Sequence, residues 1–110
     1  MSFHKETETL VKKAIQKEYE NACNEWGEKY NSLHEGWAIV KEEIAEAKEG
    51  YKGVKRSNKI LWEALTRDDI ECAESGIELI QDYAYECVLE MLQVIACCRK
   101  LEKTLKEKEC

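Results

Sequence analysis

The 110-residue sequence contains no proline and only five glycines, so few residues interrupt a helix. It has no apolar run of the roughly eighteen residues that a membrane span requires, and its first residues, MSFHKETETL, lack the apolar core of a signal peptide. We therefore expect a cytoplasmic protein with no membrane partner. The 17 basic residues are outnumbered by 23 acidic ones, and the net charge of −6 argues against nucleic-acid binding, which needs a basic surface.

The cysteines also lack the paired spacing of zinc and redox sites. None forms a CxxC pair, and the adjacent Cys97 and Cys98 would point about 100° apart on a helix. Thiols stay reduced in the cytoplasm, and free cysteines are commonly buried as small apolar side chains. We expect all six to be structural thiols: Cys23, Cys72, Cys87, Cys97, Cys98 and Cys110.

What the chain does contain is an abundance of Glu, Lys, Ala, Leu and Ile, with apolar residues at helical spacing. A first helix is predicted over about residues 5–30. Ser32 and Glu35 have the S-x-x-E spacing of a capping box, which predicts the start of a second helix, and Thr66 is the candidate N-cap of a third. A short polar turn makes the second and third helices antiparallel neighbours. The prediction is one all-α domain, residues 1–110, built from three long helices.

Apolar residues recur every three or four positions along each helix, in stripes that we interpret as core. The first stripe is Val11, Ile15, Tyr19, Ala22, Trp26 and Tyr30. The second is Leu33, Trp37, Val40, Ile44, Ala47, Tyr51, Val54, Asn58, Leu61 and Leu65. The third is Ile70, Ala73, Ile77, Ile80, Ala84, Val88, Met91, Ile95, Cys98, Leu101 and Leu105. Two such stripes on one hairpin exceed what a small chain easily covers, so we expect a helical bundle formed by a homodimer or homotetramer.

An acidic side chain lies in the most apolar part of the third helix. Ten of the twelve residues in CVLEMLQVIACC (87–98) are apolar, and the other two are Glu90 and Gln93. Burying a carboxylate is costly unless a partner offsets its charge. If the turn centres between residues 67 and 68, facing residue numbers sum to about 135, so the cluster Glu42, Glu43 and Glu46 lies at the height of Glu90.

Converging carboxylates repel one another, and a divalent cation relieves that repulsion. Glu42, Glu43 and Glu46 share one face of their helix, and Glu86 lies one turn before Glu90. The alternative is a solvent-exposed acidic face that binds nothing. We favour a site for Mg²⁺ or Mn²⁺, which prefer hard oxygen ligands, because of the apolar surroundings of Glu90.

The stretch HEGWAIVKEEIAEA (34–47) followed by ECVLEMLQVIACCRK (86–100) resembles the MazG-like nucleotide pyrophosphohydrolases of the all-α NTP pyrophosphatase superfamily, in a phage- or prophage-type branch. The resemblance covers about residues 30–101. Glu42, Glu43 and Glu46 match the family's EExxE motif, and Glu90 matches the Glu of its ExxD motif. Gln93 stands where the family has a metal-binding Asp, and it supplies an oxygen without charge.

The resemblance implies a Mg²⁺- or Mn²⁺-dependent hydrolase that splits a nucleoside triphosphate into a monophosphate and pyrophosphate. Glu43 would orient the attacking water as the catalytic carboxylate. The candidate metal ligands are Glu42, Glu46, Glu86, Glu90 and Gln93. The candidate phosphate-binding cations are Lys41, Lys48, Lys55, Arg99 and Lys100, although lysines on charged helices are usually solvated. Trp37 is a candidate for stacking on the base, or else a core residue.

Two other functions remain open. Because Gln93 carries no charge, the chain is also interpretable as a catalytically weak relative that binds or sequesters a nucleotide. The third hypothesis is a helical module whose apolar stripes recruit a protein partner. A bound divalent ion would separate the first two functions from the third, and turnover would separate the first from the second.

Overall fold

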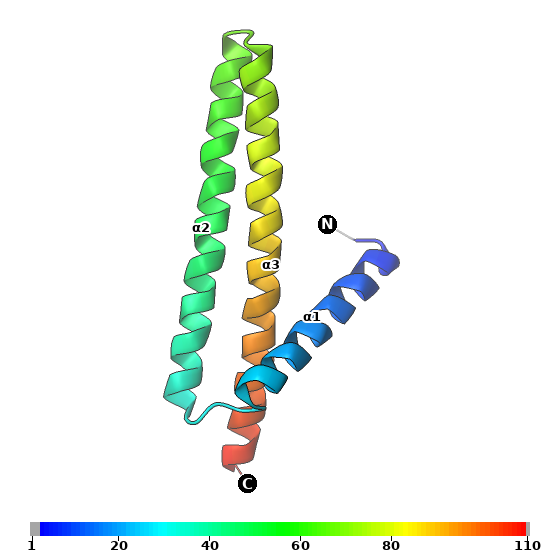
Figure 1. Cartoon of the computed structure of the whole chain (residues 1–110), viewed down its shortest axis with the longest axis vertical. Coiled ribbons are helices and arrows are strands. Elements are labelled where there is room, and N and C mark those ends of the chain that lie inside the picture. The colour runs from blue at the N-terminus through cyan, green and yellow to red at the C-terminus, as the bar shows by residue number, and fades with distance from the viewer. Residues whose placement is uncertain (1–2, 110) are drawn as a thin grey trace. The chain divides into compact units, whose positions relative to one another are not determined.

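The computed structural model describes residues 3–109, which form three helices and no strand (Figure 1). α1 spans Lys5–Trp26, α2 spans Leu33–Thr66 and α3 spans Ile70–Glu109. The all-α prediction is confirmed. No segment of these helices combines the length and the apolar character of a bilayer-spanning helix. The predicted thiol Cys110 lies outside the described residues, and the other five cysteines are free thiols.

Two of the predicted helix boundaries near residue 30 can be compared with the structure. α1 ends at Trp26 rather than near residue 30, because Gly27 takes a positive φ of 90° and donates its backbone N–H to the Cys23 carbonyl at 2.9 Å. Tyr30 is therefore outside the helix. The predicted start of α2 is confirmed, since the Ser32 hydroxyl oxygen accepts the Glu35 backbone N–H at 3.0 Å.

The N-cap predicted for α3 is wrong. Thr66 is the last residue of α2, and its hydroxyl donates to the Glu63 carbonyl at 2.7 Å. Asp69 caps α3 instead, since its carboxylate accepts the Cys72 backbone N–H at 3.1 Å. The turn uses the three residues after Thr66, including Asp68 at a φ of 54°, so the capping position moves to the residue just before Ile70.

The chain divides into two compact units, which we describe separately. One comprises the residues up to Glu43 and those from Met91 onward, and the other comprises Ile44–Glu90. The second unit is the antiparallel hairpin of α2 and α3 (Figure 1). Its register is set by three contacts: Gly50 with Cys87, Gly53 with Tyr83, and Gly76 with Leu61. Facing residue numbers sum to 136 or 137, so the predicted register is confirmed.

Small residues form the contact between the two helices of the hairpin. A Cβ atom added at Gly76 would lie 3.2 Å from the Leu61 backbone, and one at Gly50 would lie 3.1–3.3 Å from atoms of Cys87. The buried positions of this unit are equally small: Ala47, Gly50, Gly53, Ser57, Ala64, Ala73 and Gly76. The backbones of the two helices therefore lie close together, with little side-chain volume between them.

This close contact overturns the interpretation of the large apolar stripes as core within one chain. The stripe residues of the hairpin that remain exposed are Ile44 at 52%, Tyr51 at 56%, Leu65 at 51%, Ile70 at 64%, Ile77 at 44% and Val88 at 57%, together with Asn58. The physical reason is that two helices in contact through small residues bury a narrow line, and the large side chains lie to one side of it.

In the first unit the stripes are also only partly buried. Ile15 is buried as predicted, whereas Val11, Trp26, Trp37, Met91, Ile95, Cys98 and Leu105 are exposed. Tyr30, which also belongs to the predicted stripe, is buried as predicted, and it packs against Gly36 at the centre of this unit. The Tyr30 backbone N–H donates to the Thr104 hydroxyl at 2.9 Å, and that hydroxyl donates to the Lys100 carbonyl at 2.9 Å. This connection satisfies the buried backbone N–H of Tyr30 in the loop between α1 and α2.

Candidate functional site

An acidic groove lies on the hairpin of the second unit. It encloses about 280 Å³, and both helices contribute to its walls. α2 supplies Glu46, Glu49, Gly50 and Arg56, and α3 supplies Tyr83, Glu86, Leu89 and Glu90. Four carboxylates and one guanidinium therefore surround a small space that opens to solvent. Of the predicted metal ligands, Glu46, Glu86 and Glu90 line this groove.

Glu46 and Glu90 come closest together in this groove. Each offers a carboxylate oxygen, and these two oxygens lie within 4.8 Å of each other. Glu90 is half-buried and Glu46 is exposed. Their approach follows from the close packing of the helices, because Ala47 and Gly50 leave no bulk between the α2 and α3 backbones. The predicted register, in which facing residue numbers sum to about 135, places Glu46 opposite residue 89, which is one residue from Glu90.

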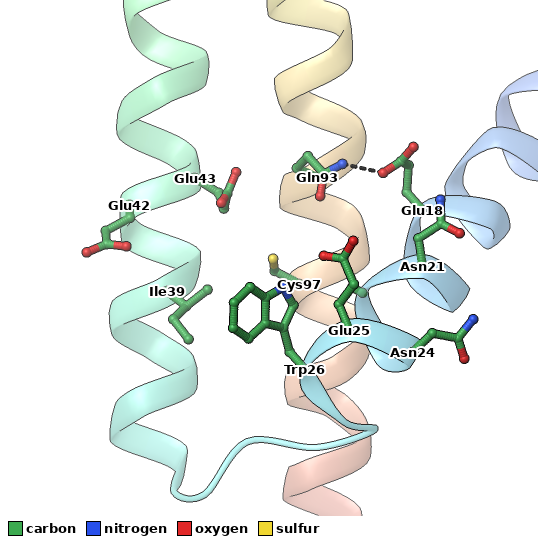
Figure 2. A pocket seen from close by; sticks show the side chains of 11 residues that line it. Glu18, Asn21, Asn24, Glu25, Trp26, Ile39, Glu42, Glu43, Gln93 and Cys97 are labelled. Carbon is green, nitrogen blue, oxygen red and sulfur yellow. Dashed lines mark hydrogen bonds between the residues drawn. The ribbon is translucent and has the colours of Figure 1, made fainter.

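Glu43 precedes Glu46 by three residues on α2, so the two side chains belong to the same face of that helix. Glu42 and Glu43 line a pocket of the first unit, which encloses about 660 Å³ (Figure 2). Figure 2 shows that α1, α2 and α3 each contribute polar side chains to it. The other lining residues are Glu18, Asn21, Ala22, Asn24, Glu25, Trp26, Ile39, Gln93 and Cys97.

Gln93 has a defined partner in this pocket. Its side-chain N–H donates to the Glu18 carboxylate, as the dashed line in Figure 2 shows. The family's Asp at this position would be an anion, which cannot donate such a bond. Gln93 therefore holds α1 and α3 together within the first unit, in addition to any role as an oxygen ligand.

The Cys97 thiol and the Tyr30 hydroxyl of the first unit stay neutral at pH 7. Burial is the main cause that raises the pKa of the Cys97 thiol, and the same cause strongly raises the pKa of the Tyr30 hydroxyl. The Tyr30 hydroxyl donates to the Cys97 carbonyl at 3.3 Å. A thiol with a raised pKa is a poor nucleophile, so Cys97 is not expected to act as a reactive cysteine in this pocket.

The predicted phosphate-binding cations on α2 lie on exposed positions. The Lys41 ammonium is 5.2 Å from the centre of the Trp37 ring, and the Lys55 ammonium is 5.7 Å from the centre of the Tyr51 ring. Lys48 is exposed. Trp37 is 60% exposed, so its large ring is accessible to a ligand rather than packed in a core.

The predicted cations on α3 have partners in the first unit. Arg99 donates to the Gln16 side-chain oxygen at 3.1 Å. Lys100 is only 5% exposed, and its ammonium lies 4.5 Å from the centre of the Tyr30 ring. A cation held against an aromatic face in this way contributes to the packing of the unit.

Sequence reasoning missed several side chains that line the two sites. Arg56 is the positively charged side chain of the acidic groove, among the described residues that line it, and it follows Glu49 by seven residues. That spacing is two helical turns and places both on one face, so a helical-wheel comparison could have found Arg56. Glu18 and Glu25, also seven residues apart, carry the same signal on α1.

Comparison of this chain with models of known protein families, with curated protein sequences and with solved structures found no match. The resemblance to MazG-like enzymes therefore rests on the motif residues themselves.

Proposed function

We propose that this chain is a divalent-cation-dependent nucleoside triphosphate pyrophosphohydrolase of the MazG-like type. The products would be a nucleoside monophosphate and pyrophosphate. The observation that carries this proposal is the pair of carboxylate oxygens, from Glu46 and Glu90, within 4.8 Å of each other in an open groove. We also propose that the enzyme acts in the cytoplasm, where nucleotides are available and its thiols stay reduced.

The donors of the groove fit a hard divalent cation. Mg²⁺ takes oxygen ligands at about 2.1 Å, so two oxygens on one ion lie roughly 3–4 Å apart. The oxygens of Glu46 and Glu90 lie within 4.8 Å of each other. Glu86 lines the same groove and is the third candidate ligand. The resemblance adds Glu42 and Gln93 to the ligand set. When bound, such an ion neutralises phosphate oxygens and makes its bound water more acidic.

Other side chains would bind the phosphates, accept the proton of the attacking water and hold the base. Arg56 supplies a positive charge to phosphate oxygens in the groove, where a planar guanidinium matches their geometry. The resemblance assigns to Glu43 the role of accepting a proton from the water that attacks the α-phosphorus, and the bond from that phosphorus to the bridging oxygen breaks as pyrophosphate leaves. The exposed Trp37 ring and Lys41, Lys48 and Lys55 remain candidates for holding the base and the phosphates.

A second function, binding or sequestering a nucleotide with little turnover, is favoured by one observation. Gln93, at the position of the family's metal-binding Asp, uses its amide N–H on Glu18. A site with one anionic ligand fewer binds its cation more weakly, and turnover would fall with the occupancy of that cation.

The experiment is a pyrophosphate-release assay over a panel of nucleoside triphosphates, with and without Mg²⁺ or Mn²⁺, on the wild type and on Glu46→Gln and Glu90→Gln. Even outer-shell residues at metal sites are worth about 10- to 100-fold, so each variant should lose at least roughly 100-fold in kcat/KM. The matched control is Glu63→Gln, an exposed glutamate on α2 outside the groove, which should keep full activity.

The outcomes separate the three hypotheses. Metal-dependent release that both groove variants abolish supports the enzyme. Metal-dependent nucleotide binding without release supports the sequestering relative. If the wild type neither binds nor cleaves any nucleotide with either metal, the enzyme proposal is wrong and the helical interaction module takes its place.

A further inference from the structure

The middle of α2 departs from the acidic character of the rest of the chain. The net charge of the chain is −6, yet residues 50–62, GYKGVKRSNKILW, contain four basic residues and no acidic one. Two aromatic residues, Tyr51 and Trp62, lie near the two ends of this stretch. The argument from net charge against nucleic-acid binding averages over all 110 residues, and it does not apply to a segment whose local charge has the opposite sign.

Four lysines lie in one row on the outer side of α2 in the second unit. We call them the lysine row, and all four are exposed: Lys48, Lys52, Lys55 and Lys59. At about 100° per residue they fall within roughly 60° of one another, half a turn from Gly50, which contacts α3. Successive members are three or four residues apart, so they recur at about 4.5–6 Å along the helix axis. The row is therefore a narrow line of positive charge.

Two exposed aromatic rings lie beside the lysine row. Tyr51 is 56% exposed and Trp62 is 65% exposed. Both lie on the same flank of the row, displaced from it by roughly 60° around the helix. The Lys55 ammonium is 5.7 Å from the centre of the Tyr51 ring, so the line of charge and the aromatic side chains adjoin each other. The outer face of α2 thus presents cations on one side and aromatic rings on the other.

Most charges of the lysine row are available to a ligand. Lys52 pairs with Glu49 at 3.5 Å, and both side chains are largely exposed. An exposed pair of this kind contributes little to stability and yields readily to another anion. Among the residues that the structure describes, no ion pair involves Lys48, Lys55 or Lys59. A ligand with several negative charges would therefore displace at most one internal partner.

The acidic residues of α3 lie away from the lysine row. Facing residue numbers sum to 136 or 137, so Glu74, Glu78 and Asp82 are level with residues 54–63 of α2. These acids are exposed and lie roughly a third to half a turn from Gly76, at the helix contact. One outer edge of the hairpin is therefore positive and the other is negative. A polyanion that lies along α2 avoids the negative edge.

We propose that the outer face of α2 binds single-stranded nucleic acid, with backbone phosphates on the lysine row and unpaired bases stacked on Tyr51 and Trp62. Proteins that bind single strands without sequence preference combine a line of cations with aromatic side chains on which bases stack. In a duplex the phosphates of one strand recur at about 3.4 Å along the axis. An unstacked strand is longer, which brings its phosphates toward the spacing of the lysine row.

Other polyanions match this face less completely. A duplex keeps its bases stacked on one another, so it offers no free base to Tyr51 or Trp62. An acidic polypeptide complements the lysine row but has no bases to stack on the rings. An anionic membrane presents a plane of charge, whereas the lysine row is a single line. The proposal goes beyond the hydrolase function and does not rest on it, because lysines bind phosphate without a divalent cation.

The first test titrates the full-length chain into a labelled thymidine oligonucleotide of about twenty residues, in EDTA, and follows fluorescence anisotropy. The Kd should be on the order of 10 µM at low salt. Each phosphate contact to a single strand contributes about −0.7 to the slope of log K against log[salt], so four lysines give a slope of about −3. Lys55→Gln with Lys59→Gln should reduce that slope to about −1.4 and weaken binding roughly 10- to 30-fold at ~0.1 M salt. Lys13→Gln with Lys17→Gln, on exposed positions of α1, is the control with the same change in charge.

The second test removes the rings. Tyr51→Ala and Trp62→Ala should each weaken binding roughly 5- to 100-fold and leave the salt slope unchanged, because stacking releases no counterions. Tyr51→Phe and Trp62→Phe keep a ring and should bind nearly as well as the wild type. Tyr85→Ala is the matched control, since it removes an exposed tyrosine from α3. Far-UV circular dichroism checks that every variant keeps its helices.

Binding that persists in EDTA, prefers the unpaired strand and depends on both the lysines and the rings supports the proposal, whether or not the chain releases pyrophosphate. A wild type that does not bind the oligonucleotide overturns it. So does binding that neither set of variants weakens, or competition by a duplex, polyglutamate or phosphatidylserine vesicles that equals competition by the single strand. Binding that needs a divalent ion and is lost in Glu46→Gln with Glu90→Gln would belong to the acidic groove and would also overturn the proposal.

Discussion

The close contact of α2 with α3 makes a specific prediction for Gly53. In Gly53→Ala the new Cβ would lie 2.3, 2.5 and 2.7 Å from three atoms of the Tyr83 ring, where ordinary contacts are 3.4–4 Å. The atoms include Cγ, at the root of the ring, so a small rotation of the ring does not remove the clash. Either Tyr83 leaves its position or the helices of the hairpin separate.

The expected size of the effect is the difference between two opposing terms. Alanine is better than glycine in a helix by about 1 kcal/mol. Overpacking costs about 1–3 kcal/mol, and contacts this short belong at the upper end of that range. The net expectation is that Gly53→Ala lowers the free energy of unfolding by about 2 kcal/mol. In a Tyr83→Ala background the clash is gone, so the same substitution should raise the free energy of unfolding by up to about 1 kcal/mol.

Urea denaturation followed by far-UV circular dichroism measures all four proteins of this cycle. The protein concentration must be the same throughout, because the apparent stability of any chain that associates depends on it. A coupling energy of about 3 kcal/mol is expected between the two positions. If Gly53→Ala stabilises the wild type, or has the same effect in both backgrounds, the close contact described here does not exist.

Three further predictions test the first unit. Thr104→Val leaves the Tyr30 backbone N–H without its buried acceptor, so thermal denaturation should show a free energy of unfolding lower by about 1–3 kcal/mol. Thr104→Ser keeps the hydroxyl and should lower it less. Equal losses would contradict the role of the hydroxyl. Gln93→Asp removes the donor to Glu18 and places two carboxylates together, so Tm without metal should fall. Scanning fluorimetry should show that Mg²⁺ or Mn²⁺ raises the Tm of this variant more than it raises the Tm of the wild type. An equal rise in both proteins would argue against a metal ligand at this position. Burial raises the pKa of Cys97 above the ordinary 9.0, so the folded state holds this proton more tightly than the unfolded state, and stability should be level below pH 9 and fall as pH rises through the folded pKa. Denaturation at pH 7, 9 and 10 should show a smaller fall for Cys97→Ala, and an identical fall would refute the assignment.

Local features of the sequence were sufficient for the helices and for the register of the hairpin. The absence of proline, the Ser32 cap and the short polar turn each act within a few residues, and a shared rise per residue carries the register along both helices. For this reason the equal height of Glu46 and Glu90, far apart in the chain, followed from the position of the turn, whereas their close approach depends on the packing of the helices. The N-cap of α3 did not follow, because the choice between Thr66 and Asp69 depends on how many residues the turn uses.

Only the tertiary structure decided which line of each helix is buried. The predicted stripe of α2 contains the large Ile44 and Tyr51 as well as the small Ala47, and hydrophobicity alone favours the larger side chains as core. Packing reverses that preference within the hairpin, because glycine and alanine let two backbones meet and gain contacts along their whole length. The large side chains, such as Ile44 and Tyr51, then remain exposed on the hairpin. That choice depends on the distance between two helices, which no local pattern of residues contains.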